Sequence, residues 1–297
     1  MAILLAALPL AGCFHPIHEL YTLDSGEGLL GTTLAWEVPE DAGSALHSLT
    51  LSVGGASTPF TRNYRDEKEA AGERIPVAAG RNDLLATANM TESDGFLLSG
   101  MPATRADAAV GDVTVSLKDP ASSPDQAWFG VTGAEIRDGA ITLAEATLQR
   151  LLSTITVDLA HVPAGTRIEL TVNNVAKSVN LTAKGANGRW GLPSADPSGP
   201  ITLAALTAAT DGPLKLAFRV LPTASTFTRC TLTFRVTSAN GNETQTVIDA
   251  PGTEGGIGYL LDLDFNALRP YLYLDSYSIS PWEDGWTVSG EILNPSE

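Results

Sequence analysis

Histidines and acidic side chains are the residues of this 297-residue chain that could carry metal or acid–base chemistry. His15 and His18 are separated by two residues, which can place two imidazoles at one metal ion, but no Cys or His cluster supplies further ligands. His47 precedes an alternating apolar run and His161 follows one, so both are interpreted as surface or edge residues. We therefore expect no metal site.

No nucleophile elbow and no Walker-type phosphate loop occur in this chain. Two carboxylates can serve a glycoside hydrolase, but Asp262 and Asp264 alternate with Leu261 and Leu263, so we expect them on the outer face of one strand. We predict a protein that is not an enzyme and that uses no cofactor.

Cys13 has the setting of a lipid acceptor. The apolar run from Ala2 to Leu10 is too short to span a bilayer and fits the hydrophobic region of a signal peptide. It ends in Leu10-Ala11-Gly12-Cys13, which looks like a bacterial lipobox. The motif implies a signal peptide over residues 1–12, a lipidated tether over 13–22, and acyl chains on Cys13 that hold the protein in a membrane. A buried helix with an incidental cysteine is the alternative.

The residues before the lipobox indicate where the natural chain starts, and the residues after it could indicate which leaflet displays the protein. No basic residue precedes the apolar run, so we expect the natural start codon a few residues upstream. Only one acidic residue, Glu19, occurs between Cys13 and Leu20, so the sequence does not indicate which leaflet displays the protein.

The net charge indicates which partners the chain does not bind, and the spacing around Cys230 indicates whether that thiol is buried. The net charge of −16 argues against binding to nucleic acid and against electrostatic attachment to anionic lipid. Cys230 shares its parity with Leu232, Phe234 and Val236, which favours a buried and inert thiol.

Alternation of apolar and polar residues from about Leu20 onward predicts an all-β chain. Such runs cover 49–53, 113–117, 155–159, 168–172, 214–220 and 259–265. One-sided alternation is typical of antiparallel sheets packed as sandwiches, and Asn240-Gly241 predicts a hairpin. We expect one β-sandwich over 23–160 and a second over 161–297. Residues 142–152 are compatible with a short helix or with a strand.

Aromatic residues gather near the C-terminus, and three interpretations of them remain open. They can form the core and rim of the last sandwich, a platform for glycans, or a terminal strand that pairs with a neighbouring subunit. The possible strand-exchange residues are Tyr271, Tyr273, Tyr277, Ile279, Trp286 and Val288.

Three segments taken in order resemble a known family. They are 74–90, which has an apolar run and a Gly turn before a second strand, 126–130 with its Trp-Phe-Gly step, and 148–157 with a Leu-Gln-Arg strand. With the lipobox in front, the chain resembles the Bacteroidales-type fimbrial subunit and anchor lipoproteins, the FimB-like anchors and fimbrillins.

The resemblance implies two transthyretin-like β-sandwich domains in tandem, export to the cell outer membrane as a lipoprotein, and assembly with other fimbrial subunits by β-strand exchange. In that family a protease trims fimbrillins after an Arg of the first domain. Arg62 and Arg65 lie in an expected charged loop over 62–74 that could serve, although an anchor subunit would not need this cleavage. The predicted function is a fimbrial (pilus) anchor or accessory subunit for fimbria assembly and cell adhesion, with a possible host protein or glycan ligand. A glycan-binding outer-membrane lipoprotein is the alternative.

Overall fold

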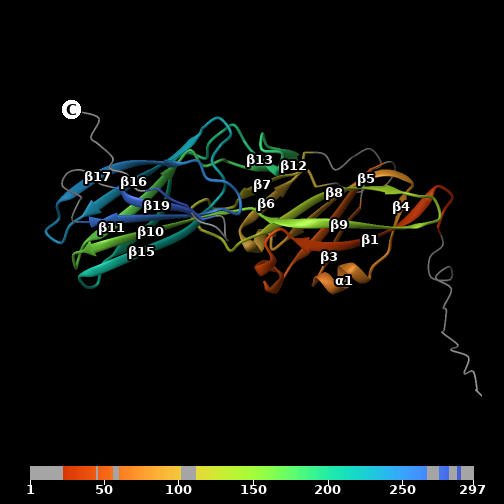
Figure 1. Cartoon of the computed structure of the whole chain (residues 1–297), viewed down its shortest axis with the longest axis horizontal. Coiled ribbons are helices and arrows are strands. Elements are labelled where there is room, and N and C mark those ends of the chain that lie inside the picture. The colour runs from red at the N-terminus through yellow and green to blue at the C-terminus, as the bar shows by residue number, and fades with distance from the viewer. Residues whose placement is uncertain are drawn as a thin grey trace, which may run out of the picture.

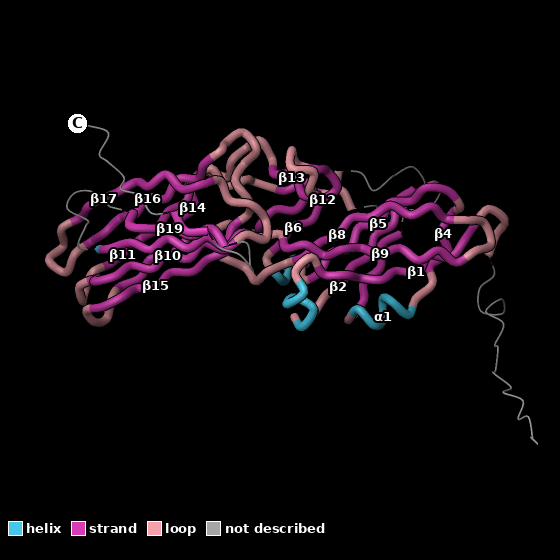
Figure 2. The backbone as a smooth tube through the Cα atoms, in the orientation of Figure 1, coloured by secondary structure: helices cyan, strands magenta, loops and turns pink. Residues whose placement is uncertain are grey.

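The protein is built almost wholly from β-strands. The computed structural model describes residues 23–44, 46–55, 60–101, 112–265, 274–280 and 286–288. The molecule is elongated, with strands of the N-terminal half at one end and strands of the C-terminal half at the other (Figure 1). Strands and loops account for nearly all of the backbone (Figure 2). The prediction of an all-β sandwich fold is confirmed.

A seven-stranded sheet in the order β3-β2-β5-β8-β9-β1-β4 forms the N-terminal end. Its strands are β1 Glu27–Trp36, β2 Leu49–Gly55, β3 Phe60–Tyr64, β4 Ile75–Ala78, β5 Gly80–Ala88, β8 Trp128–Ile136 and β9 Ile141–Arg150. Three short helices accompany it: η2 Pro39–Gly43, α1 Glu67–Gly72 and η3 Glu92–Asp94. No helix among the described residues is long and apolar enough to cross a bilayer.

Two sheets form the C-terminal end. The five-stranded sheet has the order β15-β10-β18-β19-β20, and the four-stranded sheet has the order β14-β11-β16-β17. The strands of the first are β10 Ser153–Val162, β15 Gly212–Val220, β18 Gly258–Asp264, β19 Leu274–Ser280 and β20 Trp286–Val288. Those of the second are β11 Arg167–Asn173, β14 Ile201–Thr207, β16 Arg229–Thr237 and β17 Glu243–Pro251. Alternate residues of β10, β11 and β16 are buried, as sandwich strands require.

A fourth sheet joins distant parts of the chain at the middle of the molecule. Its order is β13-β12-β7-β6, with β6 Phe96–Ser99, β7 Thr114–Leu117, β12 Val179–Lys184 and β13 Trp190–Pro193. Val179 lies opposite Val115, and both side chains are buried. The sheet therefore ties the segment after β11 to strands that precede β8.

The sheet pairings bear on the expected division at residue 160. That position falls within β10, and β10 pairs antiparallel with β15 and parallel with β18. The first half contains a similar arrangement, in which β1 pairs antiparallel with β4 and parallel with β9. The division into two domains stays a prediction, and the pairings favour a boundary before Ser153.

Residues 142–152 adopt the strand alternative. β9 runs to Arg150, and its side chains alternate between exposed and buried, with Ala144, Ala146 and Leu148 buried and Leu143 64% exposed. The helical stripe would have required Leu143 to be buried together with Leu148. The parallel pairing with β1 decides the outcome, because it provides the backbone partners that a strand needs.

Two further local predictions agree with the structure. Asn240 and Gly241 lie in the turn between β16 and β17, and Gly241 has a φ of 85°, as a left-handed turn residue requires. Cys230 is 1% exposed, and its thiol donates to the Pro251 carbonyl at 3.3 Å. Burial raises the pKa of the Cys230 thiol to about 12, so the group stays neutral at physiological pH.

Candidate functional site

The terminal strands lie at the edge of the five-stranded sheet. β19 pairs antiparallel with β18, where Tyr277 lies opposite Leu261 and Ile279 opposite Tyr259. β20 pairs with β19 in turn, with Trp286 opposite Ile279. The described part of the C-terminal segment is therefore paired within its own chain.

The described strands contain four of the six predicted strand-exchange residues. Tyr277 and Ile279 belong to β19, and Trp286 and Val288 belong to β20. Tyr271 and Tyr273 lie outside the described residues, as do Cys13, the signal peptide and tether over residues 1–22, and the two tether histidines.

β18 can accept a strand on the edge where β19 lies. Its side chains alternate, and Tyr259, Leu261 and Leu263 are each buried. On one side β18 pairs with β10, and on the other with β19. If β19 left this position, a row of backbone N–H and C=O groups of β18 would lose its partners, which is the arrangement that a strand from another chain can satisfy.

The expected loop over 62–74 is shorter than predicted. Arg62 belongs to β3 and forms an ion pair with Glu73, so its position in a loop is corrected. Arg65 lies between β3 and α1, and its side chain is 87% exposed. The helix arises because Asp66 accepts a hydrogen bond from the Glu69 N–H at 2.8 Å, as an N-cap residue does.

Within residues 60–74, an arginine-specific protease is expected to cut after Arg65 before it cuts after Arg62. Arg65 is exposed outside the strands, whereas cutting after Arg62 requires β3 to leave its pairing with β2. Limited proteolysis followed by intact-mass analysis should show a fragment that begins at Asp66. R65Q should remove this fragment and R62Q should keep it; the reverse pattern would contradict the prediction.

A buried polar cluster lies between η2 and the strands β8 and β9 of the seven-stranded sheet. Arg150 Nε donates to Asp41 Oδ2 at 2.7 Å, Arg150 Nη2 donates to Asp41 Oδ1 at 2.5 Å, and Trp128 Nε1 donates to Asp41 Oδ2 at 2.8 Å. Trp128 and Arg150 lie opposite each other on β8 and β9. Trp36 packs edge-on against Trp128 with ring centroids 5.6 Å apart. This network fixes η2 against the sheet, and no local pattern in the sequence indicates it.

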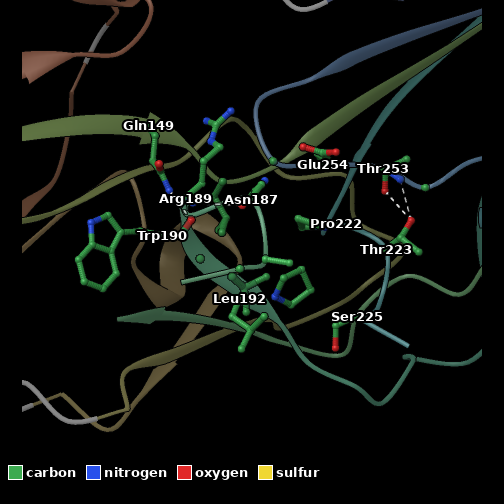
Figure 3. A pocket seen from close by; sticks show the side chains of 18 of the residues that line it. Gln149, Asn187, Arg189, Trp190, Leu192, Pro222, Thr223, Ser225, Thr253 and Glu254 are labelled. Atoms are coloured by element: carbon green, nitrogen blue, oxygen red, sulfur yellow. Dashed lines mark hydrogen bonds between the residues drawn. The ribbon is translucent and has the colours of Figure 1, made fainter. Parts of the chain in front are cut away.

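A cleft of about 450 Å³ opens next to this cluster. Gln149, Arg189 and Trp190 lie on one side of it, and Thr223, Thr253 and Glu254 on the other (Figure 3). The walls come from Phe129 of β8, the end of β9, the β12–β13 hairpin and the loops before β16 and after β17. No signal in the sequence marked these segments as neighbours.

The remaining histidines and acidic side chains are candidate metal ligands and acid–base groups. Among the described residues, no group of three or more His, Cys, Asp or Glu side chains could hold a metal ion. His47 Nε2 lies 2.7 Å from Asp94 Oδ1, and His161 Nδ1 lies 3.1 Å from Asp264 Oδ1. Hydrogen bonds from Thr91 and from His47 hold the pKa of Asp94 below its usual range despite the opposing effect of burial. Both histidines are surface residues in single pairs.

Comparisons with known proteins find relatives in structure but not in sequence. No protein-family model matches the sequence, and no curated protein matches it. The fimbrial anchor protein Mfa2 from Porphyromonas gingivalis matches 86% of this chain and 98% of its own, with 12% identity and a TM-score of 0.52. A candidate adhesin from Bacteroides thetaiotaomicron matches 90% of this chain and 98% of its own, with 14% identity and a TM-score of 0.54.

A third solved structure agrees with these two. A candidate polysaccharide-binding protein from Bacteroides thetaiotaomicron matches 91% of this chain and all of its own, with 10% identity and a TM-score of 0.54. The three matches extend over nearly the whole chain, so they concern the arrangement of all the sheets and not one sandwich. The chain has the fold that Bacteroidales adhesins and fimbrial proteins share, as the resemblance in its sequence predicted.

Proposed function

We propose that this protein is a fimbrial anchor or accessory subunit, held in the outer membrane by acylated Cys13, that joins other fimbrial subunits and serves cell adhesion. The observation that supports the proposal best is the match to the fimbrial anchor protein Mfa2, which covers 98% of that protein. The lipobox supplies the anchor, and neither the sequence nor the described residues suggest catalysis.

Assembly would use the edge of the five-stranded sheet. Among the described strands, β19 pairs with β18 and β20, and β20, the last of them, pairs with β19 alone. Exchange of β19 for a strand of a neighbouring subunit keeps the backbone hydrogen bonds of β18 and replaces an intramolecular contact by an intermolecular one. The proposed strand-exchange segment is therefore β19 with β20.

A reversible lock on β19 tests this proposal. Leu260 and Ser278 lie opposite each other on β18 and β19, and facing residues of antiparallel strands are close enough for a disulfide. In the host cell, tagged wild type should bring down fimbrial subunits as a ladder. The double variant L260C and S278C should lose the ladder when oxidised and regain it when reduced.

A second lock is the matched control. Arg235 and Gln245 lie opposite each other on β16 and β17, so the double variant R235C and Q245C locks a hairpin that the proposal does not open. Its ladder should persist when oxidised. A wild type that brings down no fimbrial subunit would overturn the proposed function, and a ladder that survives the lock on β19 would overturn the role of the terminal strand alone.

A further inference from the structure

The central cleft has the size and concavity of a ligand site. Its volume of about 450 Å³ falls within the range of roughly 300–1,000 Å³ that is typical of ligand pockets. Five segments that are far apart in the sequence line it, so the cleft exists only in the folded chain.

The cleft is pre-organised by hydrogen bonds within its walls. Gln149 Nε2 donates to the Trp190 carbonyl at 2.7 Å, and the Arg189 N–H donates to Asn187 Oδ1 at 3.1 Å. Across the cleft the Thr253 N–H donates to Thr223 Oγ1 at 2.7 Å. These bonds hold the side chains and loops in place before a ligand arrives, which lowers the entropic cost of binding.

The charges of the cleft disfavour an anionic ligand. Arg189 Nη2 lies 2.6 Å from Glu37 Oε2, and Arg150 is bound to Asp41, so both guanidinium groups of the lining already have carboxylate partners. The side chain of Glu254 adds a carboxylate at the rim, where the residue is exposed. A net charge of −16 on the whole chain repels anions further.

The remaining lining offers both polar and apolar surface. Side-chain amides, a hydroxyl and a carboxylate come from Asn187, Gln149, Ser225 and Glu254. Apolar surface comes from Leu192, Pro193, Pro222 and from Phe227, which is 40% exposed. Sugars match this combination, because their hydroxyl groups bond to planar amides and carboxylates while their C–H faces pack on apolar rings.

We infer that the central cleft binds a neutral glycan. Glu254 accepts hydrogen bonds from sugar hydroxyls, Asn187 both donates and accepts, and Phe227 packs against a C–H face. This site goes beyond the assembly role and does not depend on it. A chain that fails to join fimbriae would still bind the glycan.

Affinity electrophoresis of the purified full chain in detergent tests the inference. The gels contain neutral polysaccharides of glucose, mannose, galactose or N-acetylglucosamine units, and parallel gels contain the anionic polymers alginate and heparin. At least one neutral polysaccharide should retard the wild type. F227A and E254Q should each weaken the retardation by about fivefold or more.

Matched exposed substitutions outside the cleft are the controls. V247A removes a side chain that is 55% exposed on β17, and E243Q neutralises an exposed carboxylate at the start of the same strand. Both should migrate as the wild type does. The inference is overturned if no neutral polysaccharide retards the wild type, if only the anionic polymers do, or if the two cleft variants are retarded as strongly as the controls.

Discussion

Replacing Asp41 with alanine should lower the free energy of unfolding by about 3–5 kcal/mol. The substitution leaves the Arg150 guanidinium, whose side chain is 6% exposed, without its carboxylate, and it removes the acceptor of the Trp128 indole N–H. Breaking a buried ion pair by removing one partner is costly because the other charge stays desolvated. Denaturant unfolding followed by tryptophan fluorescence measures the change.

Two controls separate the buried pair from a general effect of lost charge. R65A breaks an exposed ion pair with Glu69 and should leave the unfolding midpoint unchanged within error. The double variant D41L and R150M replaces both charges by apolar groups and should be more stable than D41A alone. If D41A behaves as R65A does, the cluster does not hold η2 against the sheet.

Replacing Cys13 with alanine should release the protein from the membrane fraction of the host cell. Each acyl chain contributes about 0.8 kcal/mol per buried methylene group, so loss of the acceptor removes the anchor completely. Fractionation with immunoblotting measures the release, and labelling with radioactive palmitate measures acylation directly. The wild type should carry the label and C13A should carry none.

The second cysteine is the natural control for this experiment. Cys230 is buried, and its pKa of about 12 keeps the thiol neutral and unreactive. C230A should therefore retain both the label and the membrane location. A C13A protein that stays in the membrane fraction or still takes up palmitate would contradict the lipobox interpretation.

The sequence resemblance has a physical basis in the structure. The Trp-Phe-Gly step lies at the start of β8 and the Leu-Gln-Arg strand at the end of β9, and the register of these strands places Trp128 opposite Arg150. Both side chains converge on Asp41. A β-carbon on Gly130 would lie 2.5 Å from the Thr147 carbonyl oxygen, so the close approach of β8 to β9 requires glycine.

Local patterns determined the parts of the fold that depend on neighbours in the chain. Alternation predicted the strands and their buried faces, because successive side chains of a strand point to opposite sides. The Asn240-Gly241 turn predicted a hairpin, because its two strands are joined by the turn itself. The parity of Cys230 predicted its burial for the same reason.

Only the tertiary structure decided which strands pair and which side chains meet. No local signal places β12 beside β7, or Asp41 beside Arg150 across 109 positions. The charged residues that follow Arg62 predict a loop, yet pairing with β2 makes Arg62 part of an edge strand. The central cleft depends on such long-range placements among all five segments that line it. Burial and backbone pairing select these contacts from many possible ones, and alternation alone carries no information about the partner.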